Sequence, residues 1–350
     1  MGEIRFLSED KLRQWLEELS RDCSVWAPVK EDEAVVFRLF DSTKELSLER
    51  QPTAPPKEAL FPKSETMLLY RYQKDPEDPG KQSLELKERQ PVGRQIVFGA
   101  RPCGARGFTI FDPVFEEGAY HDPYYQVRRE KTSFVTLTCT TPENSCFCHW
   151  VGSSPSDPAG SDVLLTPVEG GYALEAVTEK GAQLLDSDLL VEGEAKRQEA
   201  EAVKQGASEA LGQAPDLSDV PERLFELFED LDFWERMSAK CISCGACTYL
   251  CPTCYCFNIS DEPSGLAGKR VRSWDNCMSY LFTLEGSGHN PRPTKAHRLR
   301  NRVGHKFSYY PELHQGIFAC CGCGRCIKSC PVCVDIREIV MSAKEHADAS

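Results

Sequence analysis

The chain has 350 residues, with 41 basic and 54 acidic side chains and a formal charge of -13. This acidic balance argues against a nucleic-acid-binding scaffold, and no apolar run reaches the roughly 18 residues of a membrane span. No secretory signal pattern opens the sequence. We therefore expect a cytoplasmic protein with enough chain for two or three domains.

The first half of the chain favours a mixture of helices and strands. Residues 1–24 have an amphipathic helical pattern, whereas apolar runs such as MLLYRY, QIVFGA and SFVTLTC, within residues 66–98 and 93–181, suit strands. The proline-rich segment 51–63 is expected to be a loop. The predicted fold class is α+β, with a mixed α/β domain over residues 1–182.

An acidic, helix-favouring stretch follows the first domain. Residues 186–235 contain 15 acidic and 4 basic side chains. We interpret 183–238 as a solvated helical connector, the alternative being a docking face for a basic partner. Residues 221–238 space Leu, Phe and Trp at helical intervals, which predicts that they pack against the following cysteine-rich region.

A basic segment contrasts with this connector. Residues 269–306 contain nine Lys or Arg, two acidic residues and three histidines. Its positive charge compensates either anionic cofactors or the acidic connector. Nucleic-acid binding is the weaker alternative, because one basic patch has no accompanying fold motif.

Cysteine is the unusual component, at 18 residues, five before position 241 and thirteen within 241–333. Cytoplasmic cysteines are usually reduced, so a dense block of them favours a metal site over disulfides.

Two cysteine runs, at 241–252 and 320–331, match the pattern C-x2-C-x2-C-x3-C-P. In that pattern the first three thiolates bind one [4Fe-4S] cluster and the fourth binds the other cluster. The spacing therefore predicts an α-helical, ferredoxin-like domain over 239–350 with two crossed clusters. Cluster one takes Cys241, Cys244, Cys247 and Cys330, and cluster two takes Cys320, Cys323, Cys326 and Cys251. Small residues, among them Gly322 and Gly324, are expected to let the backbone approach the clusters.

The remaining cysteines leave alternatives open. Four thiols in the first domain are enough for a third [4Fe-4S] cluster, with buried free cysteines or a zinc site as alternatives: Cys103, Cys139, Cys146 and Cys148. Cys254, Cys256 and Cys277 are interpreted as packing residues and thiol donors to the clusters. They make an incomplete ligand set unless Cys321, Cys333 or a histidine joins them.

The motifs of other enzyme classes are missing. The sequence has no G-x-G-x-x-G, G-x4-G-K-[ST], H-E-x-x-H or G-x-S-x-G motif. It therefore offers no nucleotide site and no hydrolase nucleophile, and we assign no catalytic residue.

Several strings resemble a known family. ARPCGARG (100–107), CPTCYCF (251–257), RSWDNC (272–277), RVGHKF (302–307) and CGCGRCIKSCPVCVDI (321–336) are similar to iron-sulfur beta subunits of cytoplasmic sulfhydrogenases and to their counterpart in anaerobic sulfite reductase. The resemblance spans roughly residues 90–340. Gly104 and Cys333 depart from the family pattern, which more often has Asp and Gly there.

The resemblance implies electron relay between two partners. One is a flavin- and NAD(P)-binding reductase subunit, and the other is a catalytic or downstream iron-sulfur subunit, of hydrogenase, sulfite reductase or heterodisulfide reductase type. One alternative is a self-sufficient iron-sulfur reductase of a small substrate such as a disulfide, and another is a zinc-stabilised interaction module. Arg325 and Lys328 are expected to raise a nearby cluster potential, so Arg325→Glu should lower it.

Overall fold

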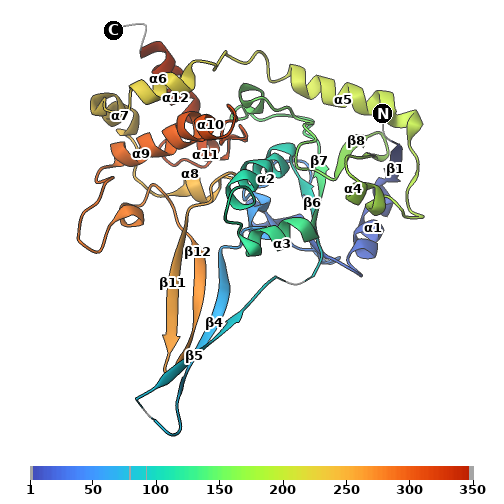
Figure 1. Ribbon diagram of the computed structural model, residues 1–350. Coiled ribbons are helices and arrows are strands. Elements are labelled where there is room, and N and C mark those ends of the chain that lie inside the picture. The colour runs from blue at the N-terminus through green and yellow to red at the C-terminus, as the bar shows by residue number, and fades with distance from the viewer. Residues whose placement is uncertain (1–2, 79, 92, 347–350) are drawn as a thin grey trace.

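The computed structural model describes residues 3–78, 80–91 and 93–346. Within these ranges, eight strands form one mixed sheet (Figure 1). In sheet order they are β10 (Val191–Glu192), β1 (Ile4–Ser8), β9 (Gly171–Ala176), β8 (Val163–Val168), β7 (Thr132–Leu137), β6 (Gln95–Ala100), β2 (Ser24–Glu31) and β3 (Ala34–Leu39).

The centre of this sheet is parallel and its margins are antiparallel. Strands β2, β6, β7 and β8 run parallel to one another, whereas β3, β9, β1 and β10 pair antiparallel. Every residue of β7 is buried, as expected for a central strand covered on both faces. The accompanying helices are α1 (Leu12–Leu19), α2 (Pro102–Phe115), α3 (Pro123–Lys131), α4 (Glu179–Leu184) and α5 (Arg197–Glu209).

The start of the chain differs from the helix predicted over residues 1–24. Residues 4–8 form strand β1, and the helix is confined to α1. Ile4 and Leu7 are buried, and β1 pairs with β9 over five residues. Tertiary pairing with a strand far along the chain thus overrides the local helical pattern.

A second sheet joins the two halves of the chain. Its four strands within the described residues are β11 (Phe257–Ser264), β12 (Ala267–Trp274), β4 (Ser64–Lys74) and β5 (Gln82–Glu88), all antiparallel. In Figure 1 this sheet projects as an arm away from the helices. Because β4 pairs with β12, residues near position 70 lie beside residues near position 270.

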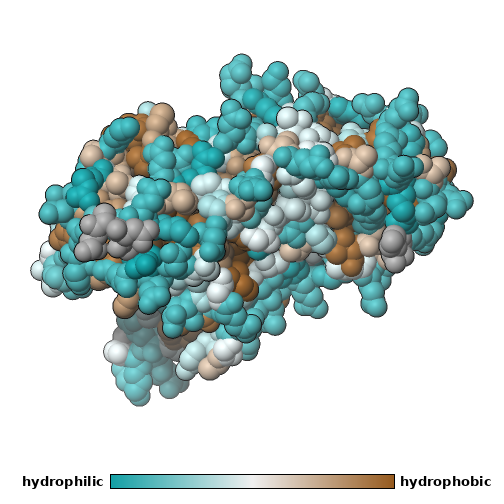
Figure 2. Space-filling model, turned by 90° about the horizontal axis from the view of Figure 1, so that it is seen from above, coloured by the Kyte–Doolittle hydropathy of each residue, from teal (hydrophilic) through white to brown (hydrophobic). Residues whose placement is uncertain are grey.

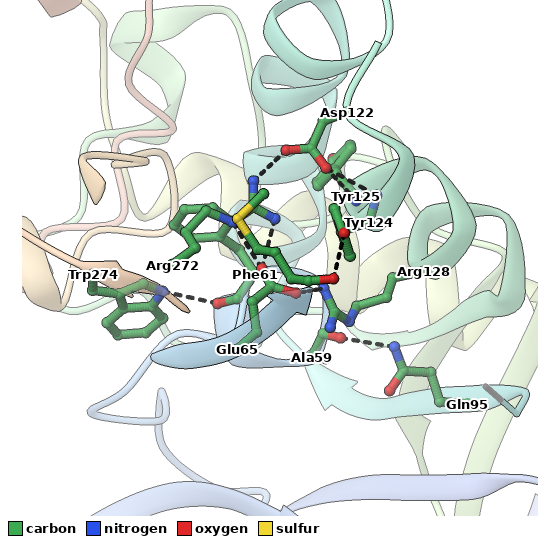
Figure 3. Close-up of polar contacts among 11 residues, drawn as sticks. Ala59, Phe61, Glu65, Gln95, Asp122, Tyr124, Tyr125, Arg128, Arg272 and Trp274 are labelled. Atoms are coloured by element: carbon green, nitrogen blue, oxygen red, sulfur yellow. Dashed lines mark hydrogen bonds and ion pairs between the residues drawn. The ribbon is translucent and has the colours of Figure 1, made fainter. Parts of the chain in front are cut away.

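A buried ion-pair network anchors this arm to α3 (Figure 3). The guanidinium of Arg272 on β12 lies 2.6 Å from the Glu65 carboxylate on β4 and also pairs with Asp122, the N-cap of α3. Arg128 on α3 lies 2.6 Å from the other oxygen of Glu65. The side chains of Arg272 and Glu65 are 2% and 6% exposed, so solvent screens this network little.

The C-terminal part is built from short helices around the cysteine runs: α6 (Val220–Glu226), α7 (Leu231–Ser238), α8 (Ala246–Tyr249), α9 (Lys295–Gly304), α10 (Tyr310–Leu313), α11 (Arg325–Lys328) and α12 (Ile336–His346). Leu224, Phe233 and Trp234 are buried in one core with Cys320 and residues of α12. The predicted packing of residues 221–238 against the cysteine-rich region is confirmed.

The mixed α/β character of the fold is confirmed. The ferredoxin-like description of residues 239–350 and the three domain boundaries stay predictions, since this segment also contributes β11 and β12 to the arm. No helix in the described part of the chain is long and apolar enough to cross a membrane. Figure 2 shows a mainly hydrophilic face on which hydrophobic side chains form small, separate areas.

Candidate functional site

The first cysteine run and Cys330 surround one cavity. Its wall contains the thiols of Cys241, Cys244, Cys247 and Cys330, together with Met278, Leu299 and Ile339. Two backbone N–H groups point at these sulfurs: Ser243 donates to the Cys241 Sγ at 3.4 Å, and Val334 to the Cys330 Sγ at 3.3 Å. Cys244 is exposed, so this cavity reaches the surface.

The second run and Cys251 surround another cavity. Cys251, Cys320, Cys323 and Cys326 line it, and all but the half-buried Cys326 are buried. The Gly322 N–H donates to the Cys320 Sγ at 3.4 Å. Such N–H donors favour a thiolate over a thiol, because they stabilise its negative charge.

The two cavities are neighbours. Arg302, Cys326 and Ile336 line both of them. The fourth cysteine of each run therefore lies with the first three of the other run, while ligation by these eight thiols stays a prediction.

Two buried cations face these thiols. Lys306 donates through Nζ to the Cys251 Sγ at 3.5 Å, to Thr253 Oγ1 at 2.7 Å and to the Ala319 carbonyl at 2.8 Å. Arg302 is 4% exposed, and its Nε has no hydrogen-bond partner among the described residues. Burial alone would lower the pKa of Lys306, but nearby thiols including Cys251 raise it well above its ordinary value.

Buried cations facing sulfur suit an anionic cofactor. No carboxylate of the described residues forms an ion pair with Lys306 or Arg302. A buried charge is costly without a partner, and a thiolate-ligated cluster supplies that partner. The eight thiols and these cations therefore fit a pair of iron-sulfur clusters.

The four cysteines of the first half converge on the second run. Cys103 lies on α2, Cys139 follows β7, and Cys146 and Cys148 lie on the loop that enters the 3-10 turn Cys148–Val151. Burial raises the pKa of Cys146 to about 11 and that of Cys148 to about 12, and the charge of Cys139 contributes to both shifts.

Arg325 connects these thiols to the second run. It is 2% exposed, donates to the Pro52 carbonyl at 2.9 Å, and lies 3.9 Å from the Cys103 Sγ through NH1. Its NH2 group has no hydrogen-bond partner among the described residues. Cys103 also packs with Cys321 and Cys323 in one buried cluster.

Two glycines of the second run also lie against the loop that carries Cys146 and Cys148. Gly322 (φ +62°) would place a Cβ 2.4 Å from the Cys148 Cα, and Gly324 (φ +72°) would place one 2.3 Å from the Ser145 carbonyl oxygen. The Phe147 N–H donates to the Gly322 carbonyl at 2.8 Å. These glycines therefore let the loop that carries Cys146 and Cys148 lie directly on the second run.

A third cavity holds the cysteines that the two runs leave out. Cys254, Cys256 and Cys277 line it together with Tyr255 and His305. The Tyr255 hydroxyl lies 2.9 Å from His305 Nε2. Burial and the charge of Lys306 lower the pKa of His305 to about 4.

The other free cysteines are scattered. Cys23 packs against the core of the first sheet, Cys321 is buried beside Cys103, and Cys333 is exposed with φ +53°. Across residues 3–78, 80–91 and 93–346, no three His, Cys, Asp or Glu side chains are grouped to hold a single metal ion. The thiols instead surround cavities.

Sequence reasoning missed the individual cations and the histidine. Arg298, Arg302 and Lys306 recur every four residues and are all buried, so the spacing within the basic segment was a usable signal of one inward-facing stripe. Lys57 is also buried and donates to the Cys254 carbonyl at 3.0 Å. It lies in the proline-rich segment predicted as a loop, where no pattern marked it.

Comparison with known proteins agrees with this chemistry. The family described as "4Fe-4S dicluster domain" matches residues 240–334. Sulfhydrogenase 2 subunit beta of Pyrococcus furiosus is 28% identical over 335 residues, which cover 92% of each chain. The chain therefore contains a 4Fe-4S dicluster domain and is similar over most of its length to a sulfhydrogenase beta subunit. Its dicluster domain is the type that binds two [4Fe-4S] clusters, the cofactors of electron-transfer subunits of oxidoreductases. No solved structure matches the chain.

Proposed function

We propose that this chain relays electrons within a cytoplasmic, multi-subunit oxidoreductase. One partner would be a flavin- and NAD(P)-binding reductase subunit, and the other a catalytic or downstream iron-sulfur subunit, of hydrogenase, sulfite reductase or heterodisulfide reductase type. The observation that carries the proposal is the pair of neighbouring thiol-lined cavities, one reaching the surface at Cys244 and the other buried. An electron could thus enter at the surface and pass inward.

The ligands proposed are the crossed sets. Cluster one uses Cys241, Cys244, Cys247 and Cys330, and cluster two uses Cys320, Cys323, Cys326 and Cys251. When bound, the clusters supply one-electron reduction and reoxidation at iron. The chain's own residues hold the sulfurs in place, donate N–H groups to them, and place Lys306 where its charge favours the reduced state.

A third [4Fe-4S] cluster is proposed at Cys103, Cys139, Cys146 and Cys148. Two observations support it. The charges of these thiols affect one another's pKa values. The buried Arg325 lies 3.9 Å from the Cys103 Sγ through NH1, and its NH2 group has no hydrogen-bond partner among the described residues. A negatively charged cluster would accept from that group.

Iron, acid-labile sulfide and zinc per chain, with an EPR spectrum after reduction, test these assignments on anaerobically purified protein. At least about eight irons with matching sulfide supports the paired clusters. A further loss of about four irons in Cys146→Ser/Cys148→Ser, relative to the unmodified protein, supports the third site. Zinc without sulfide overturns the electron-transfer proposal.

The alternative is a self-sufficient reductase, and the thiols of the third cavity are the observation in its favour. A chemical reductant distinguishes the two functions in the isolated chain. A relay passes electrons to redox dyes, whereas a self-sufficient reductase also turns over a small disulfide.

A further inference from the structure

The third cavity has the composition of a cofactor site. Three thiols and one imidazole line it, those of Cys254, Cys256, Cys277 and His305. The space free of protein atoms is about 300 Å3 here and about 290 Å3 in the second cavity. The two cavities are thus similar in size.

The proposed ligands come from three segments that the fold brings together. Cys254 and Cys256 lie just before β11, and Cys277 lies just after β12, so the pairing of these strands sets the thiols side by side. His305 follows α9, and Lys57 from the first half of the chain donates to the Cys254 carbonyl beside the site. The site thus lies where the arm meets the body of the protein.

His305 opens an irregular turn. Residues His305–Tyr309 form a π-helical turn directly after α9. Such turns insert one residue into a helix, are rare, and are frequently found at functional sites. This turn directs two successive side chains to cofactor cavities: His305 lines the third cavity, and Lys306 lines the second and the third.

The charge around the third cavity is positive. Arg302 and Lys306 line it, and Lys57 donates to the Cys254 carbonyl. All three cations are at most 4% exposed, and none pairs with a carboxylate among the described residues. The Lys57 Nζ lies 3.9 Å from the centroid of the Trp274 ring, and burial lowers its pKa. An anion in the third cavity would stabilise the charged forms of all three side chains.

We propose that the third cavity binds an additional [4Fe-4S] cluster, held by the thiolates of Cys254, Cys256 and Cys277 and by the imidazole of His305. A histidine completes the set of four ligands that three cysteines leave incomplete, and histidine replaces cysteine in known iron-sulfur sites with a higher reduction potential. The cluster would adjoin cluster two across Arg302 and Lys306. This inference rests on the iron-sulfur function proposed above.

The test compares the iron and sulfide content of the full chain with that of Cys254→Ser/Cys256→Ser/Cys277→Ser, purified anaerobically. We expect the variant to lose about four irons and four sulfides per chain. The EPR signals of the paired clusters should remain, which separates this site from the proposed function as a whole. Cys23→Ser/Cys333→Ser, which removes two thiols outside all three cavities, is the matched control and should keep its full iron content. A triple variant with unchanged iron and sulfide overturns the proposal.

A second measurement decides the question if the triple variant fails to fold. Pulsed EPR of the reduced unmodified chain should show a histidine nitrogen coupled to a cluster. His305→Cys should keep all of the iron and lose that nitrogen coupling, while His297→Gln, a change on the neighbouring helix α9, should keep it. A nitrogen coupling that is absent from the unmodified chain, or that persists in His305→Cys, overturns the assignment of His305.

Discussion

The Nζ atom of Lys306 lies 3.5 Å from the Sγ atom of Cys251, and both residues are buried. The ammonium group is held from three sides, because it also donates to Thr253 and to the Ala319 carbonyl. Cys251 is the proposed ligand that the first run contributes to cluster two. A fixed positive charge at this position stabilises the extra electron of a reduced cluster.

Removing this charge should therefore lower one reduction potential. For Lys306→Met, which keeps most of the length of the side chain, we expect the midpoint potential of cluster two to fall by on the order of 100 mV. Anaerobic redox titration followed by EPR measures it. Lys344→Met removes a cation that binds Asp219 outside the three cavities and should leave every midpoint potential unchanged. Equal potentials in Lys306→Met and the unmodified chain would refute this role of Lys306.

Arg325 should act in the same way on the proposed third cluster. The sequence alone suggests Arg325→Glu as the test of this charge. Arg325 is only 2% exposed, so that change would bury a carboxylate. Its effect on folding would then obscure any change in the midpoint potential of the cluster. Arg325→Met removes the charge beside Cys103 without adding another. We expect a midpoint potential lower by about 50–100 mV. Lys328→Met is the control, because Lys328 is exposed and pairs with Glu143, and it should shift no potential by a comparable amount.

The cysteine spacing carried more information about the site than the hydrophobic pattern carried about the fold. The repeated C-x2-C-x2-C-x3-C-P run predicts which thiols belong together because the geometry of its first three cysteines is local and the crossing of the fourth follows from the repeat. The arm could not be predicted in this way, because β4 and β12 are about 200 residues apart and only their tertiary pairing defines the sheet. The N-terminal strand β1 was missed for the same reason.

The basic segment shows the limit of composition. Its charge predicted compensation of anionic cofactors in general terms, but composition does not tell a buried cation from an exposed one. Lys306 and Arg302 are buried beside thiols, whereas Arg270 pairs with Asp261 on the exposed arm. The role of His305 depended on the π-helical turn, which has no sequence signature of its own.

The contact between Gly322 and the Cys148 loop should be sensitive to one methyl group. In Gly322→Ala the new Cβ would lie 2.4 Å from the Cys148 Cα, a backbone atom that cannot move aside alone. We expect displacement of the loop and loss of about four irons per chain, those of the third cluster.

Gly316→Ala is the control for the strain that an alanine suffers in a left-handed backbone conformation. Gly316 has φ +80°, and no atom lies within 4 Å of the new Cβ. It should cost about 1 kcal/mol of stability and no iron. Full iron content in Gly322→Ala would contradict the placement of the third cluster against this loop.

The network of Figure 3 should dominate the stability of the arm. Glu65→Gln removes the carboxylate that Arg272 and Arg128 share. Among the described residues, this leaves the buried guanidinium of Arg272 with one carboxylate partner, Asp122, and leaves the partly buried Arg128 without one. We expect the free energy of unfolding to fall by about 3 kcal/mol, because breaking a buried ion pair on one side leaves an uncompensated charge. Anaerobic chemical denaturation followed by circular dichroism measures this change.

The control is Asp261→Asn, which breaks the ion pair between Asp261 and Arg270 on the same sheet. These two side chains are 46% and 47% exposed, so the change should lower the free energy of unfolding by less than about 1 kcal/mol. Equal losses in the two variants would mean that burial does not set the strength of the network, and that the arm is held to α3 chiefly by the apolar contacts around Phe61 and Trp274.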